Sequence, residues 1–334
     1  MRVAQVEQYN KNNISLNLID IDKPYRGEKE VLIRVVAAGV NPLDNMISRG
    51  EVKMIVPYKL PLIAGNEFVG IVTEIGTKVG KFQTGDRVFA RLHLDRIGAF
   101  AEYVSVDEAA LAKVPEYLSD VEAAVPLTAL TIMQALELMK AESGKTIFIS
   151  GGTGGVGAMA IPISKAKGLN VITNGSAENK DRVLELGASR FIDYKTQDYT
   201  KSLSDIDYAL DTLGKDETEK QMSILKKGGK LVSLRAMPNG AFAKRMNLAK
   251  CKQFLLAIAG RKFDKLAEKY DVSYDFIFVE SNGKQLQEVA DIFEKLKIKP
   301  STDTVYPFED VNTALDKVAN GRSKGKTVIT MERK

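Results

Sequence analysis

The apolar residues divide the chain into two regions with different periodicities. Up to about residue 120, short apolar runs alternate with glycine-containing turns. Four of these runs are typical of β-strands: Val31–Val36, Val69–Ile75, Asp86–Ala90 and Ala101–Val104. Beyond residue 120, apolar strands alternate with segments of helical periodicity, which predicts a doubly wound parallel sheet. We therefore expect an α/β protein in which a β-rich domain precedes a parallel-sheet domain.

The second region predicts six strands: Thr146–Ile149, Leu169–Thr173, Phe191–Ile192, Tyr208–Leu210, Lys230–Leu234 and Asp275–Val279. Four helical segments accompany them: Ser119–Met139 with Ser119 and Glu122 as a capping box, Glu178–Leu186, Ala241–Tyr270 and Gln285–Leu296. The third is amphipathic and rich in lysine. We expect it to pack against the sheet, with a membrane contact as the weaker alternative.

A glycine-rich loop lies between the first strand of this region and a helix that begins at about Gly155. Residues Gly152, Thr153, Gly154, Gly155, Val156 and Gly157 fit the pattern G-x-G-x-x-G. Glycines at these positions allow a tight turn, the approach of a pyrophosphate and close packing of helix on strand. The helix N-terminus supplies N–H groups for phosphates. The alternative is a glycine-rich turn without a ligand, but the strand–loop–helix context favours dinucleotide binding.

The composition argues against nucleic-acid, membrane and metal partners. The 334 residues carry a net charge of +5, with basic and acidic residues interspersed, so we do not expect nucleic acid as a partner. No apolar run is long enough to span a membrane, and the N-terminal residues have no apolar core of the signal-peptide kind, so we expect no membrane partner and a cytoplasmic protein. One cysteine, Cys251, and one histidine, His93, make a protein-bound zinc site hard to assemble, so we expect no metal.

Several motifs resemble one family along essentially the whole chain. Gly65–Gly76 resembles the G-x-E-x-x-G-x-V segment of the medium-chain dehydrogenase/reductase superfamily. Ala38–Asp44 resembles the A-G-x-N-P-x-D of its quinone oxidoreductase branch, and the likeness continues through Phe82–Val88, Pro126–Leu130 and the glycine loop. The resemblance implies a GroES-like catalytic domain of residues 1–120 and 280–334 and a Rossmann NADP(H)-binding domain of residues 121–279. It also implies a homodimer that pairs along the strand around Phe276–Val279.

The same resemblance bears on metal. Zinc-dependent relatives carry a cysteine near the position of Asn41, a histidine at that of Asn66 and a four-cysteine lobe that this chain lacks. Residue types and family comparison therefore agree on a zinc-independent member.

The second strand of the parallel sheet indicates which nucleotide binds. It is followed by Asn174, Gly175 and Ser176, with no acid to bond a ribose 2′-OH. In quinone oxidoreductases a Ser, a Lys and a Tyr matching Ser176, Lys180 and Tyr194 hold a 2′-phosphate. NADP(H) is therefore expected over NAD(H). Taken alone, Lys180 can be an exposed helix lysine, and Asn174 can instead satisfy a turn.

Other cofactor contacts are implied by the resemblance. Thr128 matches a threonine that reaches the nicotinamide region, although it can equally bond its own helix. Leu213 and Gly214, after the fourth strand, match a loop that lines the nicotinamide. The tail Gly321–Lys326 resembles a G-x-x-x-G-K segment, so Lys324 and Lys326 can reach the phosphates or belong to a solvated basic turn.

The resemblance also places Asn41 and Asp44 in the active site, where Asn41 can supply a donor that Asp44 orients; turn chemistry explains both equally well. A tyrosine common two residues beyond this aspartate is replaced by Met46, so the proton comes from Tyr58 or solvent. Without zinc, an acceptor that delocalises charge itself is favoured. We therefore expect hydride transfer from NADPH to a quinone or an α,β-unsaturated carbonyl.

Three other functions remain open from the sequence. An enoyl-thioester reductase and a zinc-free alcohol dehydrogenase use the same fold, and a non-catalytic NADPH-binding or sensing protein would need the nucleotide site alone.

Overall fold

The structure is a computed structural model that describes residues 1–12, 14–321 and 323–331. The chain forms two compact units, one of Met1–Leu130 with Glu280–Lys334 and the other of Thr131–Val279. The division falls after Leu130, whereas the resemblance puts it at residue 120. The physical reason is that the intervening segment is tied to the first unit, where the N–H of Leu127 donates to Glu67. Within the described residues, no helix combines the length and apolarity needed to cross a bilayer.

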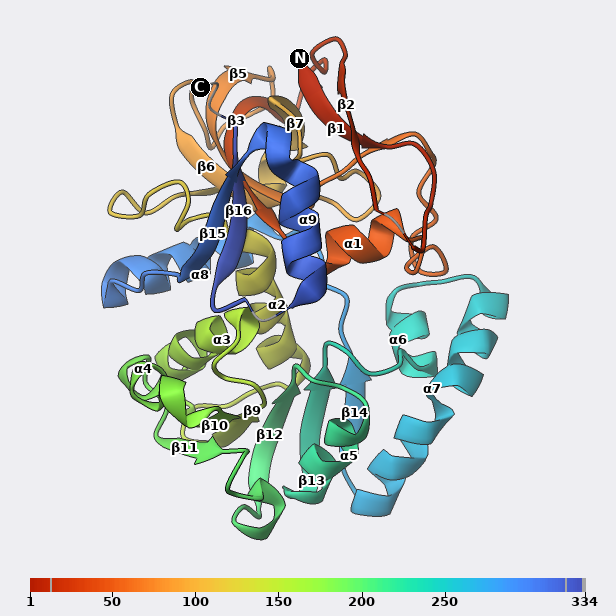
Figure 1. Cartoon of the computed structure of the whole chain (residues 1–334), viewed down its shortest axis with the longest axis vertical. Coiled ribbons are helices and arrows are strands. Elements are labelled where there is room, and N and C mark those ends of the chain that lie inside the picture. Colours follow the sequence, from red (N-terminus) through yellow and green to blue (C-terminus); the bar gives the residue numbers. More distant parts are fainter. Residues whose placement is uncertain (13, 322, 332–334) are drawn as a thin grey trace. The chain divides into compact units, whose positions relative to one another are not determined.

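The first unit is built on mainly antiparallel strands, with β15 and β16 as a parallel pair (Figure 1). Its seven-stranded sheet has the order β15-β16-β3-β5-β6-β8, and β7 pairs with β3. The strands of this sheet are β3 (Glu30–Val40), β5 (Glu67–Ile75), β6 (Arg87–Arg91), β7 (Tyr103–Asp107), β8 (Ala112–Lys113), β15 (Thr302–Pro307) and β16 (Lys326–Thr330). A three-stranded sheet of β1 (Arg2–Val6), β2 (Asn17–Asp20) and β4 (Leu62–Ile63) completes the strands. The helices of this unit are α1 (Pro42–Ser48), α8 (Gly283–Leu296) and α9 (Val311–Asn320), together with the start of α2 (Pro126–Leu138).

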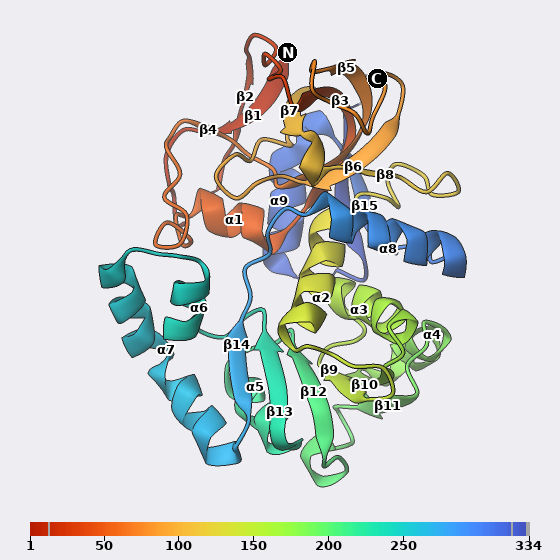
Figure 2. The same ribbon diagram turned by 180° about the vertical axis from the view of Figure 1, so that it is seen from behind.

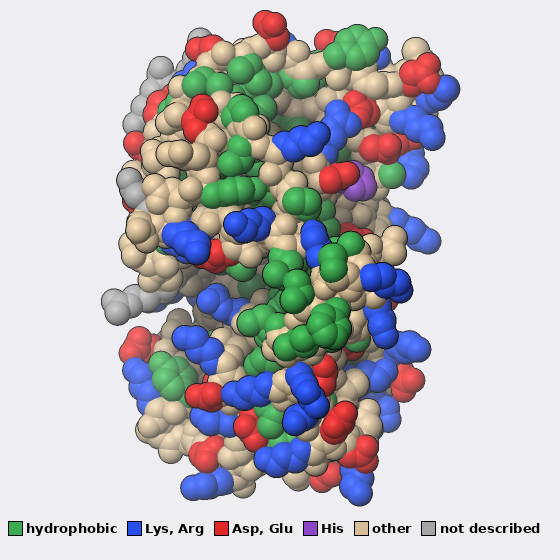
Figure 3. Space-filling view, turned by 90° about the vertical axis from the view of Figure 1, so that its right-hand side faces the viewer, with side chains coloured by type: hydrophobic (Ala, Val, Ile, Leu, Met, Phe, Trp, Pro, Cys, Tyr) green, Lys and Arg blue, Asp and Glu red, His purple; other side chains and the backbone are tan. Residues whose placement is uncertain are grey.

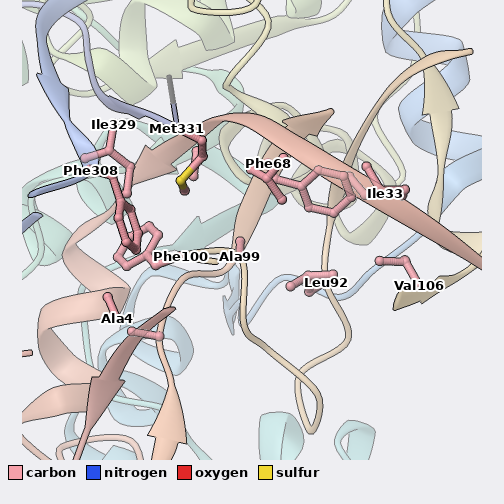
Figure 4. Close-up of a cluster of buried hydrophobic side chains, with 14 of the residues drawn as sticks. Ala4, Ile33, Phe68, Leu92, Ala99, Phe100, Val106, Phe308, Ile329 and Met331 are labelled. Carbon is pink, nitrogen blue, oxygen red and sulfur yellow. The ribbon is translucent and has the colours of Figure 1, made fainter. Parts of the chain in front are cut away.

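The core of this unit joins the two ends of the chain. Phe68, Phe100 and Phe308 are fully buried in one cluster, and Ala4 and Ile329 lie beside them (Figure 4). Strand β16 pairs antiparallel with β3. The expected return of the tail to the first domain is therefore observed.

The second unit is a six-stranded parallel sheet of order β11-β10-β9-β12-β13-β14 (Figure 2). Its strands are β9 (Thr146–Ile149), β10 (Asn170–Gly175), β11 (Arg190–Asp193), β12 (Ile206–Asp211), β13 (Leu225–Ser233) and β14 (Ser273–Phe276). Its helices are α3 (Gly155–Ala166), α4 (Lys180–Glu185), α5 (Asp216–Ser223), α6 (Gly240–Arg245) and α7 (Lys250–Tyr270). The strand order reverses between β9 and β12, which is the switch point of a dinucleotide-binding sheet. The doubly wound sheet is confirmed.

Several expected elements differ in extent, and for three of them the structure shows the reason. The helix predicted from Ser119 begins at Pro126: Ser119 and Glu122 do bond each other, but they form a turn, and a proline at the first helical position sets the start. The segment Ala241–Tyr270 is two helices, α6 and α7, because Asn247 adopts a left-handed φ of 49° that ends the first. The sixth strand ends at Phe276, since it has then reached Ser233, the last residue of its partner β13.

Candidate functional site

The glycine loop lies at the carboxyl end of β9 and opens α3 without a capping side chain. Gly154 is the N-cap, so the first N–H groups of α3, from Gly155, Val156 and Gly157, face the loop rather than a side-chain acceptor. A helix N-terminus of this kind attracts the negative charge of a phosphate. The loop therefore has the backbone chemistry of a pyrophosphate site.

The structure gives a different reason for a glycine at each of several positions in the loop. Gly151 has a φ of 65°, so the tight turn falls one residue earlier than the sequence pattern suggests. A Cβ at Gly152 would lie 2.0 Å from Oγ1 of Thr173, and one at Gly157 would lie 2.4 Å from the carbonyl of Gly151. A Cβ at Gly154 would meet nothing nearer than 3.5 Å. Two glycines are thus required by packing, whereas Gly154 leaves its outer side open to a ligand.

Asn174 holds this loop in place. It is buried at the end of β10, and its Oδ1 accepts the N–H of Gly151 at 2.8 Å, while its carbonyl accepts that of Gly152 at 3.0 Å. Asn174 therefore stabilises the turn through both its side chain and its carbonyl.

Ser176, Lys180 and Tyr194 gather at the carboxyl ends of β10 and β11. The N–H of Tyr194 donates to the carbonyl of Gly175, immediately before Ser176. Ser176 is half-buried and its Oγ accepts from Asn179, whereas Lys180 and the ring of Tyr194 are exposed. No carboxylate follows β10 before Glu178, which is exposed. These neighbouring side chains provide hydroxyl donors and one ammonium.

Arg182 is a residue that the sequence analysis missed. Its Nη2 donates to the carbonyl of Thr153 at 3.1 Å, so the guanidinium lies against the glycine loop. No spacing in the sequence marked it, because residues two apart on a helix, as Lys180 and Arg182 are, point to different sides. Arg182 is therefore a second cation, besides Lys180, near the glycine loop.

A buried carboxylate shapes the loop after β12. Asp211 accepts the N–H groups of Leu213 and Gly214 at 3.0 and 2.8 Å, together with three side-chain donors, from Thr218, Gln221 and Ser233. Leu213 remains partly exposed, and a Cβ at Gly151 would lie 3.4 Å from its Cδ2. The loop therefore presents an apolar side chain beside the glycine loop.

In the first unit, a buried polar network is centred on Glu67. Its Oε1 accepts from Nδ2 of Asn41 at 2.7 Å and forms an ion pair with Lys326, while Oε2 accepts the N–H of Leu127 at 2.5 Å. Nζ of Lys326 also donates to Oδ1 of Asn41 at 2.6 Å. Because Nδ2 of Asn41 further contacts the carbonyl of Gly39 at 3.3 Å, the amide of Asn41 is engaged on both sides. Glu67, from the G-x-E-x-x-G segment, was not singled out by the sequence analysis.

Asp44 adds a second buried carboxylate to this network. It accepts the N–H of Asn41 and Nδ2 of Asn66, each at 2.7 Å. Burial raises the pKa of Asp44 from 3.8 to about 6, against the opposing effects of these two donors and of Lys326. Asp44 therefore caps α1, as turn chemistry predicts, and also titrates much closer to neutrality than an exposed aspartate.

Tyr58 and Arg91 bring donors to the same region. Among the described residues, the hydroxyl of Tyr58 and the Nε and Nη2 atoms of Arg91 are buried without a hydrogen-bond partner. Burial raises the pKa of Tyr58 to about 12 and lowers that of Arg91 to about 10, and the two groups interact electrostatically. Tyr58 thus keeps its proton at neutral pH and has it available to donate.

Two further residues that the sequence analysis expected at the cofactor are Thr128 and Lys324. Thr128 is buried in the first turn of α2 and belongs to the first unit. Lys324 is exposed, and its backbone N–H donates to Asp303. Arg322 lies outside the described residues. The tail therefore divides, with Lys326 committed to the buried network and Lys324 facing solvent.

In the parts of the chain that the structure describes, no three His, Cys, Asp or Glu side chains are grouped as metal ligands. Around Asn41 and Asn66, at or near the positions that carry zinc ligands in zinc-dependent relatives, the network holds amides, two carboxylates and the ammonium of Lys326. The two carboxylates and the ammonium are each bonded to partners within the network.

Comparison with known proteins agrees with this geometry. A family model described as "Alcohol dehydrogenase GroES-like domain" matches residues 27–116, and one described as "Zinc-binding dehydrogenase" matches residues 186–329, a segment that contains neither Asn41 nor Asn66. The chain is 30% identical over 354 residues to the mouse protein named NAD(P)H oxidoreductase RTN4IP1, mitochondrial, covering 98% of this chain and 88% of the relative. It is 32% identical over 313 residues to the tomato 2-methylene-furan-3-one reductase, covering 90% and 72%.

Among solved structures, the quinone oxidoreductase from Coxiella burnetii superposes with a TM-score of 0.83 at 26% identity, covering 99% of each chain. Three findings lead to one assignment: two domain models match the chain, oxidoreductases match almost its whole length, and the second unit is a Rossmann sheet with its glycine loop. The chain belongs to the medium-chain dehydrogenase/reductase superfamily, in its zinc-independent quinone and enone oxidoreductase branch.

Proposed function

We propose that the chain is an NADPH-dependent oxidoreductase that reduces a quinone or an α,β-unsaturated carbonyl. The observation that carries the nucleotide choice is the set of groups at the ends of β10 and β11: Ser176, Lys180 and Tyr194, with no acid in the segment Asn174–Ser176. A segment without an acid and with an ammonium nearby suits a 2′-phosphate, whereas the carboxylate typical of NAD sites would repel it. The substrate class is supported by the names of the tomato reductase and the Coxiella enzyme.

The residues of the second unit fit the nucleotide. The open side of Gly154 and the first N–H groups of α3 would receive the pyrophosphate, with Arg182 as a nearby cation. Leu213 offers an apolar surface for the nicotinamide ring, held by Asp211 through the loop backbone. When bound, the nucleotide supplies the hydride.

The first unit would supply the proton. The hydroxyl of Tyr58 is protonated at neutral pH and has no internal acceptor among the described residues, so it can donate to an oxygen or carbon that gains charge. Asn41 has no spare donor, since Glu67 and Gly39 take both of its N–H groups. We therefore assign Asn41, Glu67 and Lys326 to positioning and Tyr58 to proton donation, with Asp44 as a second titrating group.

Oligomeric state and location are also proposals. We propose a homodimer that pairs along β14, because this strand ends the order of the parallel sheet, and a cytoplasmic location. Sedimentation of the purified chain and fractionation of the source cell would test the two separately.

A panel of acceptors tests the reaction. NADPH consumption is measured with benzoquinone, phenanthrenequinone, an alkenal, an enone and crotonyl-CoA, each repeated with NADH and with a chelator. We expect turnover of quinones or enones, unaffected by the chelator, with kcat/KM at least about tenfold higher for NADPH. Tight NADPH binding with no turnover of any acceptor would instead indicate a binding or sensing protein.

A further inference from the structure

Helix α7 has large apolar side chains on the side that faces solvent. Its inner stripe, Leu256, Gly260, Phe263 and Ala267, is buried. Phe263 stacks on Tyr274 of β14 at 5.3 Å between ring centroids, and a Cβ at Gly260 would lie 2.5 Å from Asn239, so the helix is fixed closely against its unit. On the opposite side, Phe254, Leu255 and Ile258 are 67%, 51% and 58% exposed. A helix packed against a domain normally places such residues inward.

Basic residues flank these apolar side chains along the same side of the helix. Lys250, Phe254, Ile258, Arg261 and Lys265 follow one another at spacings of three and four residues, so they lie on one face. All five are exposed, as are Cys251, Leu255 and Lys262 beside them. We call these eight residues the outer face of α7. Figure 3 views the side of the molecule that carries α7 in Figure 1, and it shows apolar side chains with many basic and some acidic side chains beside them.

Positive charge predominates in the segment that leads into and forms most of this face, although Asp264 and the exposed Glu268 follow on the last turns of α7. Between Glu219 and Asp264 the chain contains eleven lysines and arginines and no aspartate or glutamate, in a protein whose basic and acidic residues nearly balance overall. A partner for the outer face must therefore tolerate or carry negative charge. A second copy of the chain placed here by two-fold symmetry would set lysines against lysines, which disfavours self-association through this face.

We propose that the outer face of α7 docks the protein on the surface of an anionic lipid bilayer. Phe254, Leu255 and Ile258 would enter the headgroup region, and the lysine and arginine side chains would reach the lipid phosphates with their apolar stems buried. A fluid lipid surface can accept a single row of protruding side chains, whereas a stable protein interface requires a broader, shaped counterpart. The sequence pattern alone favoured packing for this segment; the exposure of these three side chains in the structure adds a second role to that interpretation.

Vesicle binding tests this proposal without reference to enzymatic activity. The full chain is sedimented with vesicles of phosphatidylcholine alone and of phosphatidylcholine mixed with phosphatidylglycerol. We expect at least about tenfold stronger binding to the mixed vesicles. Raising the salt from about 0.1 to 1 M, which shortens the Debye length from about 10 to 3 Å, should weaken it strongly.

Paired variants locate the surface. Phe254→Ser with Ile258→Ser, and separately Lys250→Glu with Lys262→Glu, should each lower binding at least about tenfold. The matched controls are Leu296→Ser with Val305→Ser, two other exposed apolar residues, and Lys284→Glu with Lys295→Glu on α8. Melting curves by circular dichroism establish that each variant is folded. Equal losses in the controls would overturn the assignment to α7.

A reporter on the unsubstituted chain covers the case in which a variant does not fold. Cys251 is the single cysteine, is exposed and lies one turn before Leu255. A polarity-sensitive fluorophore attached there should shift to the blue with mixed vesicles and not with neutral ones. No shift and no sedimentation would refute the proposal. Binding to soluble polyaspartate without vesicle binding would point to an acidic protein instead, and a dimer abolished by the Phe254 and Ile258 substitutions would point to self-association; either overturns it.

Discussion

Nζ of Lys326 lies 2.6 Å from Oδ1 of Asn41, which precedes it by 285 residues. The same ammonium is paired with Glu67, so one cation from the last strand joins two segments near the start of the chain. Gly39 makes this possible, because a Cβ there would lie 2.4 Å from Oε1 of Glu67 and 2.5 Å from Cε of Lys326. The first unit is therefore closed by a buried charge pair as well as by its apolar core.

Removing the cation should destabilise the first unit. Lys326→Met leaves the buried Glu67 without its charge partner, which costs roughly 3–5 kcal/mol of unfolding free energy. Chemical denaturation followed by circular dichroism measures this. The exposed Lys59→Met should change the value by less than about 0.5 kcal/mol. The double variant Glu67→Gln with Lys326→Met should recover part of the loss; a double variant as unstable as the sum of its single changes would mean that the two residues do not interact.

Asp44 should give an unusual pH dependence. Its folded-state pKa of about 6 lies above the unfolded value of 3.8, so the folded state binds the proton more tightly. Its contribution to stability is therefore greatest below about pH 4, falls as the pH rises to about 6 and is then constant. Urea denaturation between pH 4 and 7 should show this decline in the wild type and a smaller one in Asp44→Asn.

Glu30 is the natural contrast for this measurement. Its pKa is lowered from 4.5 to about 2, chiefly by its bond to Arg96, so its contribution is present above pH 4.5 and lost as the pH falls towards 2. Glu30→Gln should therefore lower the free energy of unfolding by a constant amount above about pH 4.5 and change the slope of the profile only on its acid side. The same slope between pH 4 and 7 in wild type and Asp44→Asn would show that Asp44 is not protonated in this range.

Lys180 should distinguish the two nucleotides. If its ammonium contacts the 2′-phosphate, Lys180→Ala should raise the Kd for NADPH by about 10- to 100-fold and leave that for NADH nearly unchanged. Isothermal titration calorimetry measures both. Lys227→Ala, an exposed lysine elsewhere in the same unit, is the control and should affect neither. Equal weakening of the two nucleotides by Lys180→Ala would remove the 2′-phosphate role.

Asn174 should behave differently because it supports the loop that both nucleotides would use. Asn174→Ala removes the acceptor of the Gly151 N–H, so NADPH and NADH should weaken by a similar factor of about ten, and stability should fall by about 1–2 kcal/mol. Calorimetry and thermal melting measure the two effects. Asn170→Ala, at the exposed start of the same strand, serves as the control. Selective loss of NADPH alone would instead place Asn174 at the 2′-phosphate.

Tyr58 should separate catalysis from stability. Tyr58→Phe removes a buried hydroxyl that has no partner in the described part of the chain, so stability should stay the same or rise by up to about 1 kcal/mol. If the hydroxyl donates the proton, kcat with an enone should fall by about 100-fold. Tyr9→Phe, which loses a 3.0 Å bond to the carbonyl of Tyr58, should show the reverse, a small loss of stability with kcat largely kept. Unchanged kcat in Tyr58→Phe would assign protonation to solvent.

The local sequence pattern was sufficient to predict the parallel-sheet unit and its glycine loop. The strand, the glycine loop and the helix after it are contiguous in sequence, so a local pattern is enough to recognise them, although Asn174 of the next strand helps to hold the loop. The absence of an acid after β10 is likewise readable from the chain. The sequence alone thus determined the fold class, the family and the position of the glycine loop.

Only the tertiary structure decided how distant polar residues combine. Lys326, Glu67 and Asn41 meet because β16, β3 and β5 are neighbours in one sheet, and no local periodicity encodes that register. The turn role of Asn174, the contact of Arg182 with Thr153 and the exposure of Phe254 and Ile258 have the same origin. Burial and long-range pairing depend on how elements pack, and packing is a property of the whole fold rather than of any segment.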